Sequence, residues 1–112
     1  MKKSLRVRCW ITIDGEKFFG PGPAELLQGV GKTGSIAKAA KAMGMSYKKA
    51  WAIIDHLNTK GQKPYVVLHK GGKKGGGAEL TPSAKTTLAA YSKLDRQLDA
   101  LVERHKGILK LF

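Results

Sequence analysis

The chain has 112 residues and a formal net charge of +13, from 21 lysine and arginine residues against 8 aspartate and glutamate residues. This length is typical of one compact domain and excludes a separate cofactor-binding half. No apolar run in the sequence reaches the roughly 20 residues that cross a bilayer, so no membrane association is expected. The single cysteine, Cys9, cannot form an internal disulfide, which favours a cytoplasmic location. The large positive charge predicts a polyanionic partner, either nucleic acid or an acidic membrane surface, and of the two we expect nucleic acid.

The N-terminal region carries the pattern of a β-hairpin over residues 1–20. Apolar and polar residues alternate over residues 5–13, which predicts a half-buried strand. Asp14-Gly15 is a turn signal, and residues 16–19 can form the return strand. The glycines and prolines of residues 20–23 then predict the start of a short helix.

Residues 35–58 have the pattern of two helices joined by a tight turn. Ser35 and Ser46 are suitable N-caps, and each precedes apolar residues at helical spacing. Ala40 is small enough for a close helix crossing, and Gly44 tolerates the positive φ of the turn. The segment predicts a helix-turn-helix, although a helical hairpin without a DNA-binding role has the same pattern.

The second of these helices is the expected DNA-reading element. At about 100° per residue, Lys48, Ala52, Asp55 and His56 face outward. The first turn of such a helix meets base edges in the major groove, where lysine can donate to guanine. The alternative for Trp51 is a half-buried contact with a neighbouring element. The residues predicted to contact DNA in this segment are Ser35, Ser46, Tyr47, Lys48, Lys49, Trp51 and Ala52.

Residues 65–80 predict a strand pair that carries a cationic loop. Residues 65–69 are rich in β-forming side chains, and a run of glycine and lysine follows them. Such a loop, or wing, can approach a phosphate or enter a minor groove through Lys70, Lys73 and Lys74. The alternative is a solvated hairpin tip.

A long helix is expected over residues 82–110, with Thr81 as its cap and Pro82 in its first position. Apolar residues follow one another at steps of three and four, as in a coiled-coil seam. This spacing fits pairing between two chains and also fits a helix that covers the core of its own domain. The residues predicted for dimerisation are Tyr91, Leu94, Leu98, Leu101 and Ile108.

The sequence carries no pattern typical of catalysis. The glycines of residues 29–33 lack the strand and the leading glycine of a phosphate-binding loop. The histidines are scattered, with no metal-ligand spacing around them. We therefore expect no enzymatic activity, no metal and no cofactor.

The motifs together resemble the N-terminal DNA-binding domain of ModE, the family of molybdate-responsive transcriptional regulators. The resemblance covers nearly the whole chain and is carried by Cys9-Trp10-Ile11, by the run from Ala39 to Trp51 that contains Ser46-Tyr47-Lys48, and by residues 71–82. LysR-type regulators share the scaffold more distantly. The resemblance implies a dimer joined through the long C-terminal helix. Molybdate-sensing members carry a further C-terminal oxyanion-binding module, and this sequence ends at Phe112. We therefore expect no molybdate response from this polypeptide, and any effector could act through a partner.

The expected fold class is α+β: one winged helix-turn-helix domain over residues 1–112, with an N-terminal hairpin and a long C-terminal dimerisation helix. The expected function is a transcriptional regulator that binds a pseudo-palindromic duplex operator as a homodimer. The alternatives are a non-specific architectural DNA-binding protein and a basic adaptor for RNA or protein.

Overall fold

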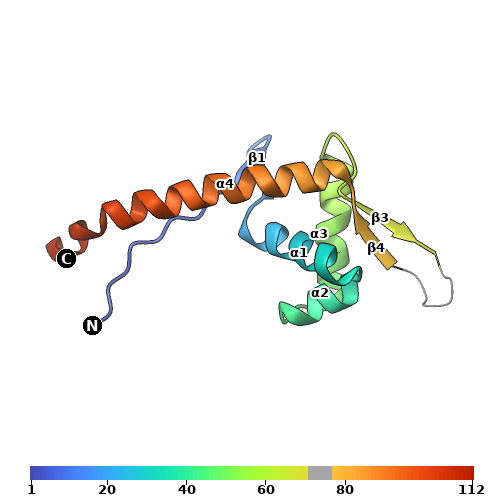
Figure 1. Ribbon diagram of the computed structural model, residues 1–112, viewed down its shortest axis with the longest axis horizontal. Coiled ribbons are helices and arrows are strands. Elements are labelled where there is room, and N and C mark those ends of the chain that lie inside the picture. The colour runs from blue at the N-terminus through green and yellow to red at the C-terminus, as the bar shows by residue number, and fades with distance from the viewer. Residues whose placement is uncertain (71–76) are drawn as a thin grey trace.

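The computed structural model describes residues 1–70 and 77–112. These residues form a mixed fold of helices and two antiparallel strand pairs, which is compatible with the expected α+β class (Figure 1). The elements in chain order are β1 (Ile11–Ile13), β2 (Glu16–Phe19), α1 (Pro21–Thr33), α2 (Ile36–Ala42), α3 (Tyr47–Lys60), β3 (Val66–His69), β4 (Gly77–Leu80), α4 (Pro82–Arg104) and a 3₁₀ helix, η1 (Lys106–Leu111).

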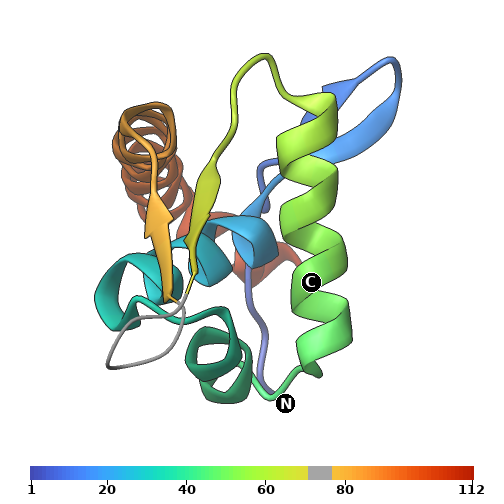
Figure 2. The same cartoon turned by 90° about the vertical axis from the view of Figure 1, so that its right-hand side faces the viewer.

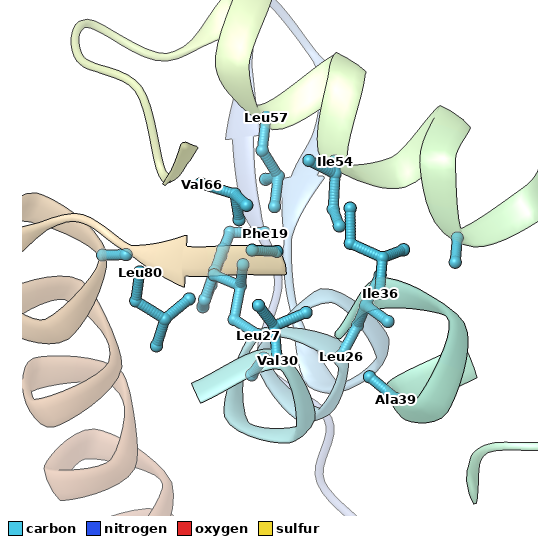
Figure 3. Close-up of a cluster of buried hydrophobic side chains, with 14 of the residues drawn as sticks. Phe19, Leu26, Leu27, Val30, Ile36, Ala39, Ile54, Leu57, Val66 and Leu80 are labelled. Atoms are coloured by element: carbon cyan, nitrogen blue, oxygen red, sulfur yellow. The ribbon is translucent and has the colours of Figure 1, made fainter. Parts of the chain in front are cut away.

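The hydrophobic core lies around α1, between α3 on one side and β4 and α4 on the other (Figures 2 and 3). Leu26, Leu27 and Val30 of α1 are completely buried. Ile54 and Leu57 reach them from α3, so the apolar faces predicted for these two helices are confirmed. The core therefore fixes the position of α3 against the rest of the domain.

The N-terminal region differs from its prediction. Only Ile11–Ile13 form a strand, and Ile11 and Ile13 are 42% and 38% exposed. The predicted half-buried strand over residues 5–13 is therefore wrong. The return strand β2 has only four residues, so residues 5–10 have no ladder partner. They instead follow α4, where the Tyr91 hydroxyl donates a 2.9 Å hydrogen bond to the Cys9 carbonyl (Figure 1).

Three helix starts agree with the sequence. The hydroxyls of Ser35, Ser46 and Thr81 each accept a hydrogen bond of 3.1 Å from the backbone N–H three residues later. Each bond satisfies a helix N–H that has no partner within the helix. Gly44, in the turn between α2 and α3, has a φ of 68°, the conformation for which glycine was predicted.

The C-terminal helix is shorter than expected. α4 ends at Arg104 and η1 follows, whereas the sequence predicts one helix to residue 110. Gly107 lies in this last stretch, and glycine is a poor helix former. Tyr91 is buried within its own chain, with its ring 5.1 Å from that of Phe19. Burial, and then the Asp95 carboxylate, raise the pKa of the Tyr91 hydroxyl, which therefore keeps its proton to a higher pH than a free tyrosine.

The later part of α4 projects beyond the core (Figure 1). Leu94, Leu101 and Ile108 are 40%, 42% and 46% exposed, and Leu98 is half-buried. The start of the helix thus covers the core of its own domain, through Ala84 and Tyr91, while its later apolar residues face solvent. The interpretation as a core-covering helix is confirmed for the first part of α4, and pairing through the later part stays a prediction.

Asn58 near the end of α3 ties this helix to the start of β3. Its side-chain oxygen accepts hydrogen bonds from the N–H groups of Tyr65 and Val66, at 2.8 and 3.3 Å, and its amide donates to the Val66 carbonyl at 3.1 Å. We expect Asn58→Ala to lower the free energy of unfolding by about 2–3 kcal/mol, because it leaves part-buried backbone groups without partners. Equilibrium urea unfolding measures this loss. Thr59→Ala is the matched control, because the exposed Thr59 hydroxyl bonds only within its own helix. Equal stability of the two variants would contradict the role of Asn58.

Candidate nucleic-acid interface

Helices α2 and α3 and the tight turn between them form one end of the molecule. The turn is closed by the Met45 N–H, which donates to the Ala40 carbonyl at 3.0 Å. Ala40 and Ala50 are buried where α2 and α3 approach each other. Both residues are small, which allows the two helices to approach closely. Tyr47 and Lys48 follow the Ser46 cap as the first two residues of α3, and both are exposed.

A groove of about 350 Å³ is lined by the start of α2, the start of α3, the end of β3 and the start of β4. The backbone N–H of Ala78 donates to the Gly34 carbonyl at 2.9 Å, which holds the strand pair against the end of α1. Residues far apart in the sequence are thereby adjacent. The predicted site residues that line this groove are Ser35, Tyr47, Trp51 and Lys70.

Tyr47 and Trp51 interact with each other on this side of α3. The Trp51 indole N–H donates a 2.6 Å hydrogen bond to the Tyr47 hydroxyl. Trp51 is half-buried and packs against the core, which agrees with the alternative of a contact with neighbouring elements. Its indole N–H is already engaged, while the Tyr47 side chain stays 53% exposed.

The surface beside the groove is basic. Lys48 and Ala52 of α3 are exposed, as the helical spacing predicts, and Lys49 is exposed as well. His56, expected to face outward as well, is half-buried with its ring 5.8 Å from that of Phe18. The reason is that β2 of the N-terminal hairpin packs against this part of α3. Lys70 is exposed at the end of β3, whereas Lys73 and Lys74 lie outside the described residues.

Two further lysines lie on α2, the helix that begins at the groove, and were missed in the sequence analysis. Lys38 and Lys41 are exposed on α2. The signal that could have found them is the absence of acidic residues: residues 26–54 contain five lysines and no aspartate or glutamate. A solvated surface usually mixes both signs of charge, so a long single-sign stretch indicates an anionic partner.

One acidic side chain lies close to the groove. The Glu79 carboxylate is 2.7 Å from the Nε2 atom of His69, and both side chains are more than half exposed. An exposed pair of this kind contributes little to stability.

The described residues contain no group of three or more His, Cys, Asp or Glu side chains that could hold a metal ion. Among the helices that the structure describes, none is both long and apolar enough to traverse a lipid bilayer.

No protein-family model matches the sequence. The chain is, however, similar to several proteins that are named as transcriptional regulators. It is 38% identical over 84 residues to the DNA-binding transcriptional dual regulator ModE of Escherichia coli, and 34% identical over 94 residues to the transcriptional regulator ModE of Haemophilus influenzae. These matches cover 75% and 84% of this chain but 32% and 37% of the relatives.

A third relative, the molybdenum-pterin-binding protein MopB of Rhodobacter capsulatus, is 40% identical over 86 residues, which are 77% of this chain and 32% of that protein. The chain therefore spans about a third of the length of these relatives. Their names describe regulators and molybdenum-binding proteins and not enzymes. The similarities are consistent with a ModE-like family.

Proposed function

We propose that this chain is a winged helix-turn-helix transcriptional regulator that binds duplex DNA with sequence preference, as a homodimer. The observation that carries the proposal is the exposed first turn of α3, which lines one groove together with the start of α2, the end of β3 and the start of β4. In this arrangement α3 enters a major groove, and Lys48 donates to base edges. Two copies would then read half-sites about 34 Å apart.

The affinity in this proposal comes mainly from phosphate contacts. Lys38, Lys41, Lys49 and Lys70 are exposed around α3 on each protomer and are the candidates for these contacts. Eight such contacts in a dimer predict a slope of about −7 for the logarithm of affinity against the logarithm of salt concentration. With this slope, we expect binding to weaken by about ten-thousandfold between 50 and 200 mM salt. Fluorescence anisotropy with a labelled duplex measures the slope, and a slope near zero would contradict the phosphate contacts.

Selection of bound fragments from a pool of random duplexes tests the function itself. We expect an enriched pseudo-palindrome that binds at least about a thousandfold more tightly than scrambled duplex at the same salt concentration. Nearly equal affinities would instead indicate an architectural DNA-binding protein. Stronger competition by structured RNA than by duplex DNA would indicate an RNA-binding module, and the absence of DNA binding at physiological salt would indicate a protein adaptor.

A further inference from the structure

A second groove lies along α3, lined by different residues from the groove beside the strand pair. It is formed by the N-terminal hairpin, the first turn of α1 and the outer surface of α3, and has a volume of about 450 Å³. This size falls in the range of about 300–1,000 Å³ that small-molecule sites occupy. Apolar groups make up most of its surface. Its lining residues are Trp10, Lys17, Phe18, Gly22, Pro23, Met45, Lys49, Ala52, Ile53 and His56.

An aromatic ring held in place forms one wall of this groove. Trp10 packs so closely on Gly20 that a Cβ atom at Gly20 would lie 2.4 Å from the indole ring. Only glycine therefore fits beneath the ring without displacing it. The contact orients Trp10 before any ligand arrives, which reduces the entropy lost on binding.

The charged groups of the groove are cationic. The Lys17 ammonium lies 4.8 Å from the centroid of the Trp10 ring, and Lys49 lines the groove from α3. None of the described residues that line the groove is an aspartate or a glutamate. An apolar cavity with an aromatic wall and two ammonium groups complements a molecule that is apolar and negatively charged.

We propose that this groove binds a small aromatic acid, a planar ring system with one carboxylate or sulfonate group. The ring lies against Trp10, Phe18 and Ile53, and the anionic group meets Lys17 and Lys49. The site shares α3 with the proposed DNA interface. The effect of the acid on DNA binding therefore rests on the proposed function. Because the acid occupies Lys49, it weakens DNA binding, and DNA weakens the binding of the acid by the same factor.

A glycine substitution tests the site without removing any side chain. A Cβ atom at Gly22 meets no atom within 4 Å, and Gly22 lines the groove, so Gly22→Leu is expected to fill the groove and leave the fold intact. Gly107→Leu is the matched control, because its Cβ also meets no atom within 4 Å and Gly107 does not line the groove. Circular dichroism and thermal unfolding verify that both variants fold.

The probe is 1-anilinonaphthalene-8-sulfonate, compared with N-phenyl-1-naphthylamine, which lacks the sulfonate. Titration calorimetry and probe fluorescence are expected to show one site per chain. We expect Gly22→Leu to weaken binding of the sulfonate by about tenfold or more, by loss of apolar contact area. Lys17→Gln and Lys49→Gln are expected to weaken it by about threefold each, as for partly exposed ion pairs, and to leave the neutral probe unaffected.

The outcomes separate this proposal from the proposed function. Equal affinity of Gly22→Leu and Gly107→Leu for the sulfonate overturns the site, as does equal affinity of the unmodified chain for the two probes. These titrations contain no DNA, so they test the ligand site even when the chain binds no duplex. With the selected duplex present, we expect the sulfonate to reduce DNA affinity in the unmodified chain and not in Gly22→Leu. An unchanged DNA affinity would overturn the coupling.

Discussion

Leu101→Glu is expected to be monomeric under conditions in which the unmodified chain forms a dimer. Leu101 is 42% exposed on the part of α4 that projects beyond the core, and Leu94 and Leu98 lie on the same side of the helix by their spacing. A seam of this kind buries leucine against leucine, so a glutamate there places an unpaired carboxylate in an apolar contact. The cost is several kcal/mol, and we expect the dissociation constant of the dimer to rise by about a hundredfold or more.

Sedimentation equilibrium measures the association, and Ala100→Glu is its control. Ala100 is exposed and neighbours Leu101 in the sequence, but helical geometry places it more than a quarter turn away from the seam. The control adds the same charge to the same helix. Association that is equally weak in both variants would show that charge, and not the leucine seam, governs pairing. A Leu101→Glu chain that remains dimeric would contradict the role of α4.

The variant also has a consequence for DNA. If two α3 helices must be held about one helical turn of DNA apart, a monomer gains the contacts of only one half-site. We expect Leu101→Glu to bind the full selected operator no more tightly than a single half-site. Leu101 does not line the groove beside the strand pair. We therefore expect binding to an isolated half-site to stay within about twofold of the unmodified chain.

Lys48→Ala is expected to lose most of the preference for the selected operator over scrambled duplex. Lys48 is exposed in the first turn of α3, the part of a reading helix that reaches base edges. A specific contact of this kind discriminates by about 1–3 kcal/mol, which is about 5- to 150-fold in affinity ratio. Binding to scrambled duplex is expected to change much less, because it depends on phosphate contacts.

Lys70→Ala is the control for this prediction, since it also removes one exposed lysine but at the end of β3. We expect it to weaken operator and scrambled duplex alike and to reduce the salt slope of the dimer by about two units, one for each copy of Lys70. Anisotropy titrations of both duplexes at two salt concentrations separate the two behaviours. Identical behaviour of the two variants on both duplexes would contradict the division between a base-reading and a phosphate-binding lysine.

Local signals were sufficient to predict several elements of this chain. The caps at Ser35, Ser46 and Thr81 and the positive φ at Gly44 agree with the structure, because each depends on a few neighbouring residues. The apolar faces of α1 and α3 agree as well, since helical spacing determines which side chains share a side. The outward direction of Lys48 and Ala52 follows from the same geometry.

Other features depended on contacts between segments far apart in the sequence. Alternation over residues 5–13 is compatible with a buried strand, but Val7, Ile11 and Ile13 are exposed, and the segment follows α4 instead. Heptad spacing could not show that Tyr91 packs against Phe19 while Leu94 and Leu101 stay exposed. Both outcomes depend on which surfaces the remaining elements cover.

The amino-acid order alone thus determined the charge, the helix ends and the side of α3 that faces solvent, because these properties arise within one or two turns of chain. The tertiary structure alone decided which residues share a surface. It placed Lys70 beside Tyr47, and it enclosed the second groove by bringing Trp10 and Gly22 to α3. Burial is a property of pairs of surfaces, so a single segment cannot specify it.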